Sequence, residues 1–140
     1  MGLWLFRKNV DRQMWLTEFH ELYRQGVPAV GFVAGFFSEK TLSNSDLMGL
    51  EESRQTLNRL LRRVKTMARP RDDNLFKLKV DYEFLLWGCM GFCEWRIKHS
   101  EAPSRRRLGK MTFFMTIAVE HWKSLRLSLG DGTDQGLGRS

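Results

Sequence analysis

The chain has 140 residues, of which 42% are hydrophobic and 28% charged, and its formal net charge is +7. This length and composition predict one folded domain with a hydrophobic core and exclude a mainly disordered chain. Two cysteines are too few for a disulfide framework, and the N-terminus lacks the layout of a signal peptide. We therefore expect a protein that is cytoplasmic or nuclear and not secreted.

The N-terminal part of the chain predicts one amphipathic helix followed by an ambiguous segment. Residues 10–25 carry apolar side chains at helical spacing, and we expect Gly26 and Pro28 to end this helix. Residues 29–37 suit either a short buried helix or a core strand, because their periodicity does not separate the two. The longest apolar run, Val27 to Phe37, has eleven residues and is too short to span a bilayer.

Residues 45–68 have the clearest helical pattern in the chain. A cluster of N-cap residues, Ser43 to Asp46, precedes them. Acidic residues lie early in this segment and basic residues late, which complements the helix dipole. Apolar residues recur at a spacing of three and four and predict one buried stripe, formed by Leu47, Leu50, Leu57, Leu61 and Val64.

Residues 74–99 support two interpretations. The segment 76–84 alternates apolar and charged residues as a half-buried strand does, yet the same region also offers apolar residues at helical spacing. No hairpin turn such as Asn-Gly follows, and we therefore favour a helix. The alternative is an α+β fold with strands near 76–84 and 92–98.

Residues 110–129 predict a helix because they contain no Gly, Pro, Asn or Asp and are too long for an unbroken strand. Gly130 stands where a helix C-cap glycine is expected. The segment 130–140 contains four glycines and should be flexible. The predicted fold is therefore mainly α, a single-domain bundle of four to five helices over residues 1–129 with a glycine-rich tail.

Two basic clusters are the clearest functional signals in the sequence. The first lies between residues 59 and 71 and contains no acidic residue, and the second follows Pro103. Arginine pairs well with phosphate, and phosphate contacts supply affinity without sequence specificity. The spacing along the chain does not show whether the two clusters meet. The candidate nucleic-acid-binding residues are Arg59, Arg62, Arg63, Lys65, Arg69, Arg71, Arg105, Arg106, Arg107 and Lys110.

These clusters predict a non-enzymatic protein that binds the backbone of RNA or DNA without sequence specificity. An acidic protein surface is an alternative partner for the same cations. A second alternative is a small regulatory or accessory adaptor of viral type that acts as a homodimer, with its interface at the 47–64 stripe or at residues 26–37. A third is a membrane-apposed, matrix-like protein that uses Trp4 and Phe6, although we do not expect membrane contact.

The remaining candidate chemistry is sparse. Cys89, Cys93 and His99 lack the fourth ligand of a structural zinc site, and we interpret both cysteines as buried thiols. The chain shows no phosphate-binding loop, nucleophile elbow or dinucleotide fingerprint, and we expect neither enzyme activity nor a cofactor. The tryptophans could stack bases, but at helical spacing we expect the core to contain Trp15, Trp87 and Trp122.

Overall fold

The structure is a computed structural model that describes the backbone of residues 2–38, 40–101 and 105–130, and the side chains of residues 12–38, 40–101 and 109–130. This part of the chain forms four helices and no strand: α1 (Gly2–Ala34), α2 (Asn44–Thr66), α3 (Asp73–Lys98) and α4 (Arg105–Leu129). The predicted mainly α, single-domain bundle is therefore confirmed. The tail predicted to be flexible lies, from residue 131 on, outside the described residues.

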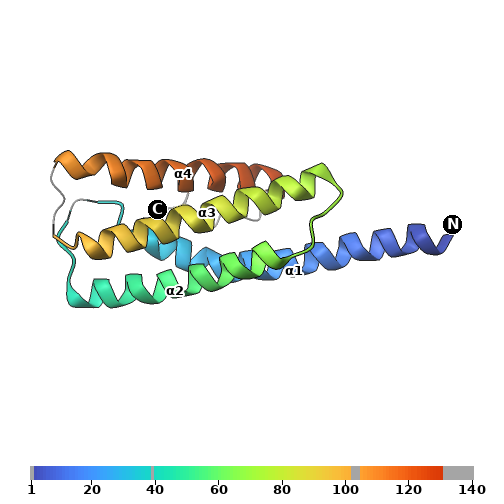
Figure 1. The fold of residues 1–140 in the computed structure, drawn as a ribbon, viewed down its shortest axis with the longest axis horizontal. Coiled ribbons are helices and arrows are strands. Elements are labelled where there is room, and N and C mark those ends of the chain that lie inside the picture. Colours follow the sequence, from blue (N-terminus) through green and yellow to red (C-terminus); the bar gives the residue numbers. More distant parts are fainter. Residues whose placement is uncertain (1, 39, 102–104, 131–140) are drawn as a thin grey trace.

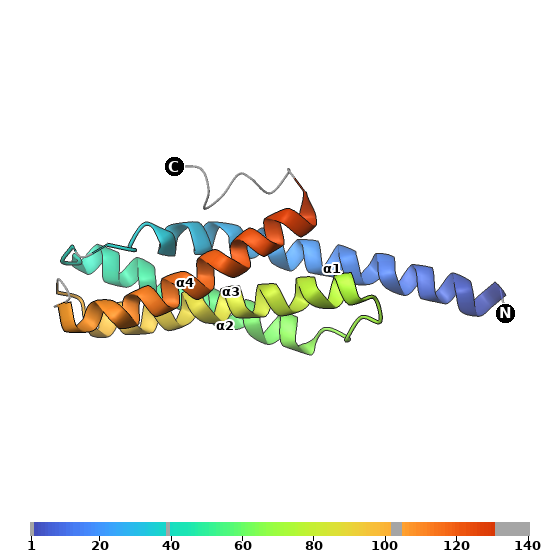
Figure 2. The same ribbon diagram turned by 90° about the horizontal axis from the view of Figure 1, so that it is seen from above.

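Three helices form a row, and the fourth packs behind them. α2, α3 and α4 lie side by side, each antiparallel to its neighbour, and α1 packs against α2 and α3 from one side (Figure 1). Figure 2 shows that α4 crosses the row at an angle and leans toward α1. There the Trp122 ring stacks on Tyr23 of α1, with ring centroids 5.9 Å apart. No described helix covers the face of the row that is turned away from α1, which we call the open face (Figure 2).

The strand alternative for segments 76–84 and 92–98 is wrong, because both lie within α3. The alternating charged residues that suggested a strand are accommodated on the helix by pairing one turn apart. Lys77 pairs with Asp81 at 3.3 Å, and Lys79 pairs with Glu83 at 3.4 Å. The alternation was therefore produced by i, i+4 ion pairs on a helix and not by the two faces of a strand.

The prediction that Gly26 and Pro28 end the first helix is also wrong, because α1 continues through both residues to Ala34. Proline inside a helix removes one backbone hydrogen bond, but buried side chains on both sides of it, including Tyr23 and Val30, hold the helix in the core. Gly26 lies against the Tyr82 side chain, whose hydroxyl donates to the Leu22 carbonyl at 2.6 Å. A side chain at position 26 would collide with that hydroxyl, so glycine serves close packing here.

α2 begins with a capping box, as the cluster of N-cap residues predicted. Ser43 is the N-cap: its hydroxyl accepts from the Asp46 N–H at 3.1 Å, and its own N–H donates to the Asp46 carboxylate at 3.0 Å. The predicted apolar stripe is buried within the chain itself at Leu50, Leu57, Leu61 and Val64. Because these side chains form the core, the 47–64 stripe is not available as a homodimer interface.

α4 begins at Arg105, before the predicted start at residue 110, and ends as predicted before Gly130, whose φ is 88°. It approaches α3 closely because Gly88 and Gly91 present no side chain at the crossing. A Cβ at Gly91 would meet the Phe114 ring, and one at Gly88 would lie 3.1 Å from the Ile117 side chain.

The buried Arg96 holds the connection between α1 and α2. Its guanidinium donates to the carbonyls of Ser38 at 3.1 Å, His99 at 2.8 Å and Lys40, and its side chain is fully buried. The Leu42 N–H donates to the Ser100 carbonyl at 2.8 Å beside it. These contacts join the start of α2 to the end of α3. We call this group of contacts the Arg96 clamp.

Candidate nucleic-acid interface

The outer face of α2 carries a shallow hollow of about 380 Å³ in its C-terminal half. The lining residues recur every three or four positions and lie opposite the buried leucines, because a helix turns by about 100° per residue. We call them the α2 stripe: Gln55, Asn58, Arg59, Arg62, Arg63 and Thr66.

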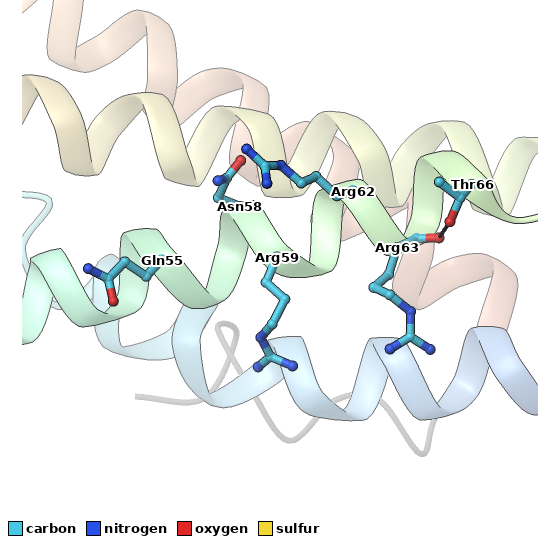
Figure 3. Close-up of a pocket in the computed structure, with 6 residues that line it drawn as sticks. All are labelled: Gln55, Asn58, Arg59, Arg62, Arg63 and Thr66. Carbon is cyan, nitrogen blue, oxygen red and sulfur yellow. Dashed lines mark hydrogen bonds between the residues drawn. The ribbon is translucent and has the colours of Figure 1, made fainter.

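The three arginines of the α2 stripe leave the helix on two sides. Figure 3 shows that Arg59 and Arg63 extend side by side in one direction, while Arg62 lies on the flank of α2 that faces α3, next to Asn58. The Thr66 hydroxyl donates to the Arg63 carbonyl at 2.9 Å and closes the end of the stripe (Figure 3). The arginines therefore occupy the middle of the stripe, with Gln55 at one end and Thr66 at the other (Figure 3).

Among the side chains that the structure describes, no carboxylate neutralises these arginines. Among the described side chains, none lies within ion-pair distance of Arg59, Arg62 or Arg63, and all three are exposed. Glu51 is instead paired with Arg54 at 2.6 Å, and this hydrogen bond holds the pKa of Glu51 below its usual value. The α2 stripe thus presents three positive charges to solvent.

The rest of the first basic cluster leads away from α2 toward α3. Lys65 is exposed near the end of α2, and Arg71 is exposed in the connection. The Arg69 guanidinium lies over the Phe76 ring, 4.4 Å from its centroid. The indole of Trp15 anchors this connection from α1 by donating to the Ala68 carbonyl at 2.8 Å.

An ion pair fixes the end of the same connection. Arg12 of α1 pairs with Asp72, and this hydrogen bond holds the pKa of Asp72 below its usual value. Asp72 is also the N-cap of α3 and accepts from the Asn74 N–H at 2.8 Å. Contacts to α1 and α3 thus set the position of the cationic segment.

The second basic cluster does not join the first. Arg105, Arg106 and Arg107 form the first turn of α4, although their side chains lie outside the described residues, and Lys110 is exposed one turn later. Figure 1 places the beginning of α4 and the end of α2 toward opposite ends of the bundle. The antiparallel order of α2, α3 and α4 requires this separation.

Sequence reasoning missed the uncharged members of the α2 stripe, Gln55, Asn58 and Thr66. Helical spacing could have identified them, because each lies three or four residues from an arginine of the stripe and so on the same side of the helix. The prediction of core tryptophans is confirmed for Trp15 and Trp122, which are buried, but is wrong for Trp87, which is 40% exposed.

The cysteines are buried thiols, as expected. Burial raises the pKa of both Cys89 and Cys93, the latter to about 12, and neither offers a thiolate at neutral pH. Within the described residues, no group of three His, Cys, Asp or Glu side chains could hold a metal ion.

A polar cluster centred on Asp81 joins α3 to α4. Nδ1 of His121 donates to Asp81 Oδ1 at 2.8 Å, Ser124 donates to Oδ2 at 2.7 Å, and Lys77 contacts both Oδ2 and Ser124. Burial raises the pKa of Asp81, but these hydrogen bonds outweigh it and hold that pKa below its usual value. Ser124 bonds to Asp81 and not to His121, so the cluster lacks the order of a catalytic triad.

In comparisons with known proteins, no family model, curated protein or solved structure matches this chain. None of the helices in the described part of the chain combines the length and hydrophobicity needed to cross a membrane.

Proposed function

We propose that this chain binds nucleic acid without sequence specificity, through phosphate contacts made by the α2 stripe, and that it is not an enzyme. The observation that carries the proposal is a row of three exposed arginines with no carboxylate in ion-pair distance among the described side chains. An exposed guanidinium without an ion-pair partner has no salt bridge to break when it binds a phosphate. The two groups then pair through two parallel hydrogen bonds.

The spacing of the stripe suits a repeating anion. Arg59 and Arg63 are four residues apart and so about 6 Å apart along the helix axis. Asn58 lies next to Arg62 and Gln55 lies one turn before Arg59, and both carry amides that donate and accept hydrogen bonds. Such groups can bind sugar and phosphate oxygens while the arginines supply the charge.

The lining of the hollow favours nucleic acid over an acidic protein. Binding energy between proteins is concentrated in buried aromatic and other large anchors, and those anchors occupy pockets on the partner. The α2 stripe is a shallow, open hollow whose residues are all polar or charged. The hollow is too shallow and open to enclose such an anchor, whereas a phosphate backbone needs no enclosing pocket.

The salt dependence of binding tests the proposal. Fluorescence anisotropy with labelled RNA and DNA oligonucleotides should show affinity falling steeply between about 50 and 200 mM salt. Removing two contacts with Arg62→Gln/Arg63→Gln should reduce the slope of log K against log salt by about 1.5, whatever the sequence of the oligonucleotide.

A matched control separates the α2 stripe from the overall charge. Arg24→Gln/Lys123→Gln removes two exposed cations from α1 and α4. This control therefore has the same net charge as Arg62→Gln/Arg63→Gln. The slope of this control should stay near that of the unmodified protein. Affinity that does not change with salt, or an equal loss in both double variants, contradicts a role for the α2 stripe.

A further inference from the structure

Three large aromatic side chains are about half exposed on the neighbouring helices α3 and α4. Phe84 is 47% exposed, Trp87 is 40% exposed and Phe113 is 50% exposed. Phe84 and Trp87 are three residues apart and share one side of α3. Trp87 and Phe113 both contact the ring of Phe114, at centroid distances of 6.1 and 5.5 Å, which joins the two helices into one surface. We call Phe84, Trp87 and Phe113 the aromatic surface.

These three rings lie outside the core, and other side chains fill the contact between α3 and α4. The glycines at 88 and 91 bring α4 against α3, and the space between the helices is filled by Ile117 and Phe114. Phe84 and Trp87 lie on the side of α3 opposite buried residues such as Tyr82 and Cys89, because a helix turns by about 100° per residue. We therefore assign them to the open face of the row, which no described helix covers.

Each exposed ring is supported by another ring. Phe84 stacks on the imidazole of His121 with centroids 4.9 Å apart and an angle of 14°, and Asp81 fixes that imidazole. Trp87 and Phe113 meet Phe114 edge-on at angles of 61° and 66°. Rings held in this way lose little conformational entropy when a flat ligand covers them.

Cations border the aromatic surface. Lys98 lies fourteen residues after Phe84 and so on the same stripe of α3, whereas Lys77, seven residues before Phe84, is already paired with Asp81. Lys110 is exposed less than one turn before Phe113. Of the carboxylates nearby, Asp81 is buried in its hydrogen-bonded cluster, Glu83 is paired with Lys79 at 3.4 Å, and Glu120 is exposed on α4.

The α2 stripe reaches the same side of the molecule through Arg62, which lies on the flank of α2 facing α3 (Figure 3). Arg54, on that flank as well, pairs with Glu94 of α3 at 3.9 Å and so reduces the negative charge there. The open face thus offers flat apolar rings with positive charge beside them, which is complementary to a chain of bases and phosphates.

From these observations we propose that the aromatic surface stacks unpaired bases, so that the ligand of this protein is single-stranded nucleic acid. The proposal deepens the proposed function and rests on it. Exposed aromatic rings next to cations bind single strands of any sequence, because every base has a flat face. A duplex keeps its bases stacked inside and cannot cover these rings.

Binding of one sequence as a single strand and as a duplex tests this specificity. The unmodified protein should bind the single strand more tightly, and Trp87→Ala/Phe113→Ala should lower that affinity about tenfold or more while leaving duplex affinity within about twofold. Met48→Ala/Leu127→Ala removes two other exposed apolar side chains, which are 75% and 87% exposed, and should change neither affinity.

The failure of this inference can be distinguished from failure of the proposed function. Base stacking is overturned if the protein binds the single strand and the duplex with equal affinity, or if Trp87→Ala/Phe113→Ala weakens both equally. In either case the reduced salt dependence of Arg62→Gln/Arg63→Gln would still support the proposed function. Sedimentation adds a further outcome: a dimer that this aromatic variant converts to a monomer makes the surface a protein interface and also overturns the inference. If neither ligand binds at low salt, both proposals fall together.

Discussion

The Arg96 clamp and the α2 stripe place arginine in opposite environments at the two ends of the bundle. Arg96 is fully buried and donates to three backbone carbonyls, while Arg62 and Arg63 are exposed and have no carboxylate partner among the described side chains. Burial lowers the pKa of the Arg96 guanidinium, because the surrounding protein solvates the charge less well than water does.

The difference shows which arginines are available to a ligand. The Arg96 guanidinium is occupied by the carbonyls of Ser38, Lys40 and His99, and a new partner would have to displace these acceptors. The arginines of the α2 stripe have no carboxylate to give up among the described side chains. Charge alone therefore does not identify a binding residue; the acceptors already around that charge decide it.

The largest expected effect is the loss of the Arg96 clamp. Arg96→Met introduces an apolar side chain of similar length, so that the carbonyls of Ser38, Lys40 and His99 lose their donor. This loss should lower the free energy of unfolding by about 3 kcal/mol. Urea denaturation followed by circular dichroism measures this. The exposed Lys98→Met serves as the control and should change stability little. A similar loss in both variants would contradict the structural role of Arg96.

A smaller effect is expected at Asp81, a second buried polar group held by its neighbours. Its folded-state pKa lies below the unfolded-state value of about 3.9, so the carboxylate stabilises the fold above that pH and the stabilisation is lost as pH falls through the folded-state pKa. Asp81→Asn should cost about 1–2 kcal/mol at pH 7.

Urea denaturation at a series of pH values measures this contribution. The difference between the unmodified protein and Asp81→Asn should shrink as the pH falls below about 4. A difference that stays constant over this range would show that the ionised carboxylate does not stabilise the contact between α3 and α4.

The smallest effect on stability is expected at the α2 stripe. Substituting glutamine for Arg59, Arg62 and Arg63 together should leave the free energy of unfolding within about 0.5 kcal/mol per residue, because each side chain is exposed and lacks an ion-pair partner among the described residues. The same urea experiment checks this. A loss as large as that of Arg96→Met would mean that these arginines support the fold, and the contrast between the two regions would disappear.

Much of the fold was predictable from local patterns. The N-cap at Ser43, the apolar stripe of α2 and the C-cap at Gly130 follow from residue type and spacing within one helix, and the structure contains all three. The arginines of the α2 stripe were also predictable as exposed, because they lie opposite that apolar stripe on the same helix.

Other features could not be predicted, because they depend on packing between helices. α1 continues through Pro28 because contacts on both sides of it hold the helix, and Trp87 stays 40% exposed because α4 reaches it only through an edge-on contact with Phe114. In the sequence, nothing distinguishes Arg96 from other charged residues near the end of a helix. Its burial depends on the connection between α1 and α2, whose Ser38 carbonyl accepts from its guanidinium. None of these causes lies within a few residues of its effect.

The sequence by itself determined that this chain is helical and which side of α2 carries positive charge, because helical periodicity and capping act over one or two turns. The tertiary structure alone decided which arginines stay open to a ligand and which aromatic rings face solvent. These outcomes depend on partners distant in the chain, such as the carbonyls of Ser38 and Lys40 around Arg96 and the Phe114 ring beside Trp87.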